Sequence, residues 1–169
     1  NGLEIKYEVL NKTKGDMYFS LGGHPAFALE LNDEIKLEDY YLEFEKDETA
    51  QIYQLRSDAL ILEEKKDYLQ NEKIIKLSGT IFDNDAIIFE NLNSSKVTLK
   101  CSKSTRELSM DYSQFPFVAF WSKPKAPFVC IEPWFGISDF ANCTGKLEEK
   151  KGILKLKEND IFTAKIIIN

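Results

Sequence analysis

Residues 3–9 alternate between apolar and charged side chains. The apolar positions are Leu3, Ile5, Tyr7 and Val9, and glutamate or lysine stands between them. Because successive side chains of a β-strand point to opposite faces of a sheet, this period of two predicts a strand with one face against a core and the other in water. The same rhythm recurs in YYLEFE, KVTLKC, RELSMDY and GILKLKENDIFTAKIIIN.

Helical spacing is rare in this chain. Only the segments 63–68 and 78–82 have the composition of a helical turn, and no long amphipathic stripe develops. Turn-forming residues lie between the expected strands, at 11–16, 32–33, 91–95 and 142–145. The chain is therefore expected to be all-β, an antiparallel sandwich or barrel, with residues 1–169 in a single domain.

The sequence opens inside the strand alternation, as a chain would if it were entered partway through a sheet. A strand at such an edge has unpaired backbone donors and acceptors, which favour pairing with another chain. This predicts a homo-oligomer formed through an exposed sheet edge.

The charge balance excludes several partners. The chain has 22 Lys+Arg and 28 Asp+Glu, and its basic residues are scattered singly, so no stripe could follow a phosphate backbone and no nucleic acid is expected. Apolar runs are shorter than the ~18 residues of a membrane span, and the first residues do not resemble a signal peptide. Cys101, Cys130 and Cys143 have neither zinc-site spacing nor disulfide density. A cytoplasmic protein with reduced cysteines and no membrane contact is expected.

The segment FSLGGHPAF contains His24, the only histidine. Gly22 and Gly23 can adopt backbone angles closed to other residues, and Pro25 fixes its own φ, so the chain is expected to turn sharply here. Two interpretations stay open. His24 is either hydrogen-bonded inside a core or accessible to a ligand that the small glycines allow to approach.

A second unusual segment is APFVCIEPWFGISDF. Its apolar run 128–131 is typical of a strand buried on both faces, and Glu132 follows directly. Desolvation of such a carboxylate raises its pKa toward the range that suits a general base, whereas a glutamate at a strand end can also simply reach solvent. Trp134 and Trp121 offer flat apolar faces on which a sugar ring can stack, or they belong to the core.

In FDNDAIIFENL, Asp83 and Asp85 precede an apolar strand. An acid at the mouth of a strand can accept hydrogen bonds from the hydroxyls of a polyol, although acids in turns usually serve the turn itself.

Four segments together resemble the aldose 1-epimerase (galactose mutarotase-like) family, and within it the branch similar to LacX proteins. They are SLGGHPAF, YYLEFE, FDNDAIIFENL and FVAFWSKPKAPFVCIEPWFGISD, and they follow one another along the chain. The pairing of GGHPAF with CIEPW is the specific part of this resemblance. It implies a large antiparallel β-sandwich, called a supersandwich, of which this chain is the C-terminal portion. It also implies a sugar-binding groove without a metal or an organic cofactor.

The resemblance further implies interconversion of the α and β anomers of an aldohexose. His24 matches the general acid that protonates the ring oxygen, and Glu132 matches the general base toward the anomeric hydroxyl. The aspartate that binds substrate hydroxyls is matched to Asp85, with Asp83 as the second choice. Gly23, Trp121 and Trp134 are the other expected substrate contacts. The absent N-terminal part would carry a second histidine and an arginine that line the groove.

Two alternatives belong to other classes of protein. One is a sugar-binding module or sugar sensor of the same fold without turnover. The other is a purely structural β domain, in which His24 and Glu132 are unrelated residues on different faces.

Overall fold

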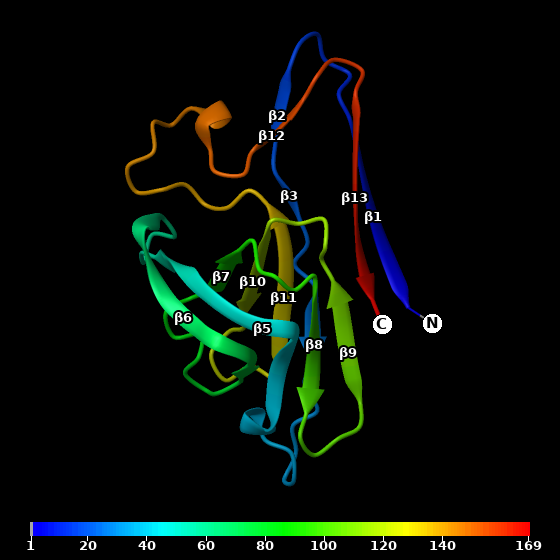
Figure 1. Ribbon diagram of the computed structural model, residues 1–169, viewed down its shortest axis with the longest axis vertical. Coiled ribbons are helices and arrows are strands. Elements are labelled where there is room, and N and C mark those ends of the chain that lie inside the picture. Colours follow the sequence, from blue (N-terminus) through cyan, green and yellow to red (C-terminus); the bar gives the residue numbers. More distant parts are fainter. Residues whose placement is uncertain (1) are drawn as a thin grey trace.

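Thirteen strands and two short 3-10 helices make up the regular structure of residues 2–169, which the computed structural model describes (Figure 1). The elements in chain order are β1 (Leu3–Leu10), β2 (Met17–Phe19), β3 (Leu21–Gly22), β4 (Ala26–Ala28), η1 (Leu37–Asp39), β5 (Tyr40–Leu55), β6 (Ile61–Lys76), β7 (Ile87–Glu90), β8 (Lys96–Cys101), β9 (Glu107–Asp111), β10 (Phe117–Trp121), β11 (Phe128–Phe135), η2 (Leu147–Glu149), β12 (Leu154–Leu156) and β13 (Ile161–Ile168). The expected all-β fold is confirmed.

Eleven of these strands form one curled antiparallel sheet. Its order is β1-β13-β9-β8-β5-β7-β10-β11-β3, with β4 beside β11 and β6 beside β5. The first and last strands of the chain, β1 and β13, run side by side (Figure 1) and pair from Leu3↔Ile168 to Leu10↔Ile161. The strands β2 and β12 form a separate two-stranded sheet. The strand β1 lies at one end of the large sheet, and its association with another chain stays a prediction.

The expected helical turn at 63–68 is wrong, because these residues belong to β6. This strand pairs only with β5 among the described residues, and most of its side chains are exposed. A solvated edge strand carries polar residues at many positions, so its composition resembles that of a surface turn. The segment 78–82 forms part of a series of tight turns rather than a helix, with Ile81 N–H donating to the Ser78 carbonyl at 3.3 Å.

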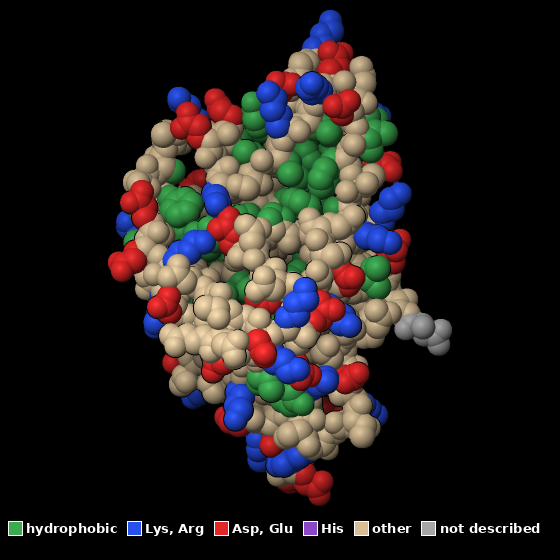
Figure 2. Space-filling view, viewed as in Figure 1, with side chains coloured by type: hydrophobic (Ala, Val, Ile, Leu, Met, Phe, Trp, Pro, Cys, Tyr) green, Lys and Arg blue, Asp and Glu red, His purple; other side chains and the backbone are tan. Residues whose placement is uncertain are grey.

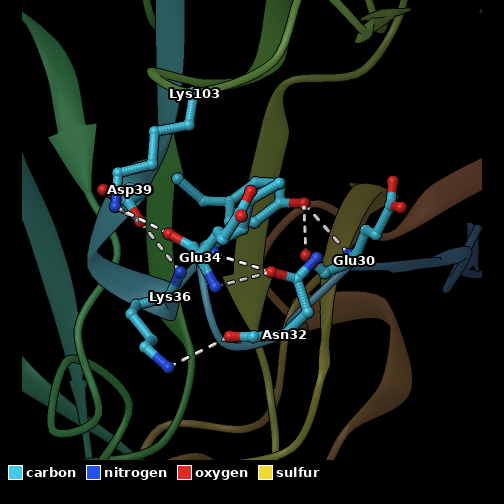
Figure 3. A network of polar contacts seen from close by, with 8 residues as sticks. Glu30, Asn32, Glu34, Lys36, Asp39 and Lys103 are labelled. Carbon is cyan, nitrogen blue, oxygen red and sulfur yellow. Dashed lines mark hydrogen bonds and ion pairs between the residues drawn. The ribbon is translucent and has the colours of Figure 1, made fainter.

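The two 3-10 helices were not expected from the sequence. Each has three residues, and no helix between residues 2 and 169 has the length or hydropathy to cross a membrane. A polar network holds η1 in place (Figure 3). Lys103 Nζ contacts Asp39 Oδ2 at 3.0 Å and donates to the Glu34 carbonyl at 2.7 Å, while Lys36 N–H donates to Asp39 Oδ2 at 2.8 Å. The start of β5 is thereby fixed against the end of β8.

The strands β10 and β11 are buried on both faces. One face packs into the main core, where the rings of Phe44, Phe89 and Phe120 meet edge-on with centroids 5.9 to 6.1 Å apart. The other face carries a smaller apolar cluster formed by Tyr53, Ile61, Ile88, Phe117, Ala119 and Ile137. Burial on both faces explains the continuous apolar runs of these strands.

Half-buried aromatic side chains link the large sheet to the β2–β12 pair. Phe162 of β13 contacts Phe19 of β2 and Phe135 of β11, with ring centroids 5.6 and 5.2 Å apart. Hydrophobic side chains gather in the upper part of Figure 2, between the β2–β12 pair and β13 of Figure 1. These contacts hold β3 and the end of β11 in position.

Candidate active site

The register of β11 brings His24 opposite Glu132. Two short strands flank His24 in sequence, and both pair with β11: Gly22 is opposite Trp134, and Ala26 is opposite Cys130. Because one register runs through both pairings, His24 lies across from Glu132. The backbone fixes this further, since Gly23 N–H donates to the Pro133 carbonyl at 3.0 Å and Ile131 N–H donates to the Pro25 carbonyl at 3.3 Å.

The two side chains are in contact. Nδ1 of His24 lies 3.4 Å from Oε1 of Glu132. The exposed fraction of the side chain is 60% for His24 and 4% for Glu132. The histidine is therefore not enclosed in a core, and the glutamate is not a strand-end residue that reaches solvent. The strand β11 instead continues beyond Glu132 to Phe135.

The surroundings of Glu132 favour its neutral form. Burial raises the pKa of this carboxyl to about 7, and the negative charge of Asp85 acts in the same direction. Ala119 stands directly opposite Glu132 on β10. Its small side chain leaves room for the carboxyl group without a compensating cation. A carboxyl group with this pKa can both accept and return a proton near neutral pH.

A groove of about 430 Å³ opens over these residues. Its lining comes from residues 20–24 in and around β3, from the end of β11 and from the loop that follows β11. The lining residues are Ser20, Leu21, Gly22, Gly23, His24, Glu132, Trp134, Phe135, Gly136, Ile137, Ser138 and Lys150. Four of the residues expected from the sequence, His24, Glu132, Trp134 and Gly23, thus line one hollow. Its volume lies within the ~300–1,000 Å³ of small-molecule pockets.

The two glycines before His24 make room for protein side chains. A Cβ atom on Gly22 would lie 2.5 Å from Cδ1 of Trp134, and a Cβ atom on Gly23 would lie 2.8 Å from Cδ1 of Ile166. Gly22 therefore allows the indole of Trp134 to lie against the backbone. The interpretation that both glycines clear space for a ligand needs this correction, although Gly23 still lines the groove.

Trp121 lies beside the histidine. The rings of His24 and Trp121 meet edge-on, with centroids 5.9 Å apart, although Trp121 does not line the groove. Trp121 is paired with Cys130. Burial raises the pKa of the Cys130 thiol to about 11, and the neighbouring Glu132 adds to this effect.

Cys130 is a site neighbour that the sequence interpretation missed. Its Sγ, one ring nitrogen of His24 and one carboxylate oxygen of Glu132 all lie within 4.8 Å of one another. These are the residues at the site that could hold a metal ion. The period of two that predicts the strands could have identified Cys130 as a neighbour of Glu132, because residues 130, 132 and 134 of one strand must share a face.

The two aspartates lie outside the groove. Asp85 is exposed, but it is near enough for its charge to raise the pKa of Glu132. Its backbone adopts a φ of 72°, in the left-handed region, and its Oδ1 accepts a hydrogen bond from Ala86 N–H at 2.8 Å. Asp83 is exposed in the preceding turn, where its N–H donates to the Thr80 carbonyl. Of the two, only Asp85 influences the site.

The loop that follows β11 forms one wall of the groove. Turn-forming residues at 142–145 were expected within it from the sequence, but its contribution to the groove was not. Gly136 and Gly152 adopt positive φ values of 87° and 74°, and a Cβ atom on Gly152 would lie 2.9 Å from Gly136 N. The loop is therefore closed at its base by two residues without side chains. Lys150 lies near its end, lines the groove and pairs with Asp139 at 2.7 Å.

Three other cavities of the described residues are larger than this groove, and one of them, of about 450 Å³, lies between the loops 91–95 and 112–116. One of about 590 Å³ lies under the loop 139–151, and one of about 790 Å³ lies between the middle of β5, β6 and the end of β7. None of the three is lined by the histidine or by a carboxyl group whose pKa is raised. The chemistry therefore favours the smaller groove as the candidate active site.

The chain resembles known proteins over most of its length. Residues 1–155 match the family model described as aldose 1-epimerase. Two LacX proteins of Lactococcus lactis subsp. lactis, one plasmid-borne and one chromosomal, are each 35% identical over 162 residues, which cover 92% of this chain and 54% of theirs. The chain thus spans about half the length of the curated relatives it matches.

Solved structures of galactose mutarotase-like proteins resemble the chain as well. A galactose mutarotase related enzyme from Lactobacillus acidophilus superposes with a TM-score of 0.90 at 33% identity, over 100% of this chain and 57% of that one. A galactose mutarotase-like protein from Lactobacillus casei superposes with a TM-score of 0.89 at 27% identity, over 99% of this chain and 58% of that one. The curled sheet is therefore that of the galactose mutarotase-like proteins.

Proposed function

Because the chain belongs to the aldose 1-epimerase family, we propose that it interconverts the α and β anomers of an aldohexose, with Glu132 as general base and His24 as general acid. One observation carries this proposal, namely the 3.4 Å contact between His24 Nδ1 and Glu132 Oε1 at the edge of a sugar-sized groove. The proposal also treats residues 1–169 as one domain, which the pairing of β1 with β13 supports.

The reaction needs two groups that lie close together. Opening the ring removes the proton of the anomeric hydroxyl and adds a proton to the ring oxygen, while the bond between the anomeric carbon and the ring oxygen breaks. Both oxygens are attached to the same carbon, so the groups that serve them must be neighbours. An acid and a base in contact, with one of them facing a groove, meet this requirement.

The two partners differ in burial, and this difference suggests the direction of proton transfer. Glu132 is almost fully buried and its pKa is about 7, so its charged form is costly and takes up a proton readily. The largely exposed imidazole of His24 can exchange its proton with water or with the substrate. After the open aldehyde rotates about one bond, ring closure from the other face returns both protons.

Of the proposed substrate contacts, Trp134 and Gly23 line the groove, while Trp121, Asp85 and Asp83 lie outside it. The indole of Trp134 offers an apolar face beside Glu132, and the ring of Trp121 lies edge-on against the imidazole of His24. We assign the hydroxyl-binding role to Asp85 because its charge already reaches Glu132, and Asp83 is the second choice. Gly23 lines the groove and is also proposed as a substrate contact, although its N–H already donates to the Pro133 carbonyl.

Polarimetry tests the proposal directly. Freshly dissolved α-galactose or α-glucose is added to the chain, and the decay of optical rotation is compared with the spontaneous rate. Acceleration that is lost in Glu132→Gln and kept in Glu63→Gln, an exposed glutamate outside the groove, would support the assignment. Equal acceleration by Glu132→Gln and the unaltered chain would refute it.

A sugar-binding module without turnover is the second candidate. The observation in its favour is length: the chain covers 54% of its LacX relatives, so groups from the rest of such proteins would be needed to complete the groove. Calorimetric titration with the same sugars separates the two functions. Saturable binding without any acceleration of mutarotation would establish the module.

A further inference from the structure

We infer that His24, Cys130 and Glu132 form a binding site for a thiophilic divalent cation such as Zn²⁺, at the point where the groove meets β11. The cation would be a competitor for the site and not a cofactor of the reaction. Binding of the cation would inhibit mutarotation, because an ion held by these residues would occupy both proton-transfer groups at once. This part of the inference rests on the proposed function.

The spacing of two ligand atoms fits such an ion without rearrangement. Tetrahedral zinc has Zn–N and Zn–O distances of about 2.0–2.2 Å, which place neighbouring nitrogen and oxygen ligands roughly 3.4 Å apart. Nδ1 of His24 and Oε1 of Glu132 are separated by 3.4 Å. An ion can therefore bridge them from the groove.

The third ligand comes from the same strand. Cys130 precedes Glu132 by two residues, so both side chains leave β11 on the same face. Sγ of Cys130 lies within 4.8 Å of the other two ligand atoms. A zinc–sulfur bond is about 2.3 Å long, and side-chain rotations of Cys130 and of the largely exposed His24 would bring the three atoms around one ion.

The donor set selects the type of cation. One imidazole, one carboxylate and one thiolate, formed when the Cys130 thiol releases its proton to water on metal binding, resemble the three-ligand sets of zinc, and they are unlike the all-oxygen shells of magnesium and calcium. Three protein ligands leave a fourth position toward the groove, where water or a sugar hydroxyl can bind. Access is available, since 60% of the His24 side chain is exposed.

Cobalt(II) provides a direct probe because it replaces zinc and is coloured. The reduced chain, without a histidine tag, is titrated with CoCl₂ under argon. The expected result is one bound ion per chain, with a thiolate-to-cobalt charge-transfer band in the near ultraviolet and the strong visible bands of tetrahedral cobalt. Added ZnCl₂ should bleach both. None of these signals depends on mutarotation, so failure here and failure of the proposed function are distinguishable.

Variants assign the ligands. Cys130→Ala should abolish the charge-transfer band, whereas Cys143→Ala, which removes the exposed free cysteine, should leave it unchanged. His24→Asn should weaken cobalt affinity by ~10-fold or more, since loss of a residue that only hydrogen-bonds to a metal ligand already costs this much. Circular dichroism confirms that each variant is folded, and Cys130→Ser replaces Cys130→Ala if the latter is not. Absence of the band in the unaltered chain, or its persistence without Cys130, would overturn the inference.

Discussion

Nδ1 of His24 lies 3.4 Å from Oε1 of Glu132, although the two residues are far apart in the sequence. The strands on either side of the histidine share one register with β11, and this register brings the two side chains together. A contact set by backbone pairing does not depend on the flexible loops of the molecule. The proposed acid and base are therefore held in position before any sugar binds.

Glu132→Gln is expected to lower the rate of enzymatic mutarotation by about 10²- to 10⁴-fold, the usual contribution of a general base. The amide keeps the shape of the side chain but cannot accept the proton. Polarimetry with α-galactose measures the effect, and Glu63→Gln serves as the control. A loss of less than about threefold would remove Glu132 from the role of base.

The pH dependence of kcat/KM should follow the ionisation of Glu132. Because its folded pKa is raised to about 7, the carboxylate form needed by a base predominates only above that pH. The rate should rise tenfold per pH unit below about 6 and level off above about 8. EDTA in the assay keeps metal ions away from the site. A flat profile between pH 5 and 8 would contradict this assignment.

The same shift has a consequence for stability. An acid whose folded pKa lies above its unfolded value of 4.5 destabilises the fold as pH rises from about 4.5 to 7. Glu132→Gln should remove this penalty, so its melting temperature should exceed that of the unaltered chain at pH 8 and match it more closely at pH 5. Calorimetry at the two pH values decides between this result and an equal shift at both.

Gly22→Ala should disturb sugar binding more than it disturbs the fold. The added Cβ would lie 2.5 Å from Cδ1 of Trp134, so the indole must move out of its position beside the groove. Overpacking of this kind costs about 1–3 kcal/mol of stability. We expect a higher KM for the sugar and altered tryptophan fluorescence. Gly79→Ala is the matched control, because nothing lies within 4 Å of its Cβ position.

Glu90 should stabilise the fold in a pH-dependent way. Burial alone raises the pKa of its carboxyl, but hydrogen bonds from Lys151, Lys65 and Tyr53 outweigh burial and lower the pKa to about 2. A carboxyl whose folded pKa is depressed stabilises the protein above its unfolded pKa of 4.5 and loses this effect as pH falls toward 2.

Glu90→Gln should therefore reduce the free energy of unfolding at pH 7 by about 1–3 kcal/mol. The difference from the unaltered chain should shrink as pH falls from 4.5 toward 2. Urea denaturation at several pH values provides the measurement, with the exposed Glu158→Gln as reference. A difference that stays constant with pH would show that Glu90 acts through packing alone.

Much of the fold could be predicted because alternation is a local property. The period of two in residues 3–9 and in YYLEFE predicts β1 and the start of β5, and the apolar run before Glu132 predicts a strand buried on both faces. The polar composition of 63–68 misled the interpretation, because an edge strand and a surface turn present similar residues to water.

The candidate site was harder to predict, because it is assembled by pairing between strands that are far apart in the sequence. His24 and Glu132 could be singled out by their unusual neighbours, whereas their separation depends on the register of two-residue and three-residue strands. Lys150 lines the groove only because Gly136 and Gly152 bring the ends of a loop together. No local sequence pattern predicts that these two glycines meet. The roles of these residues stay predictions until rates are measured.

The alternation of side chains along β11 separates two tasks on a single strand. Val129 and Ile131 belong to the main core, while Cys130, Glu132 and Trp134 point to the opposite side. Directed evolution of sugar preference can therefore vary Trp134 while Glu132 is kept and the odd-numbered positions preserve the scaffold, and a deletion of one residue in this strand would exchange the two sets.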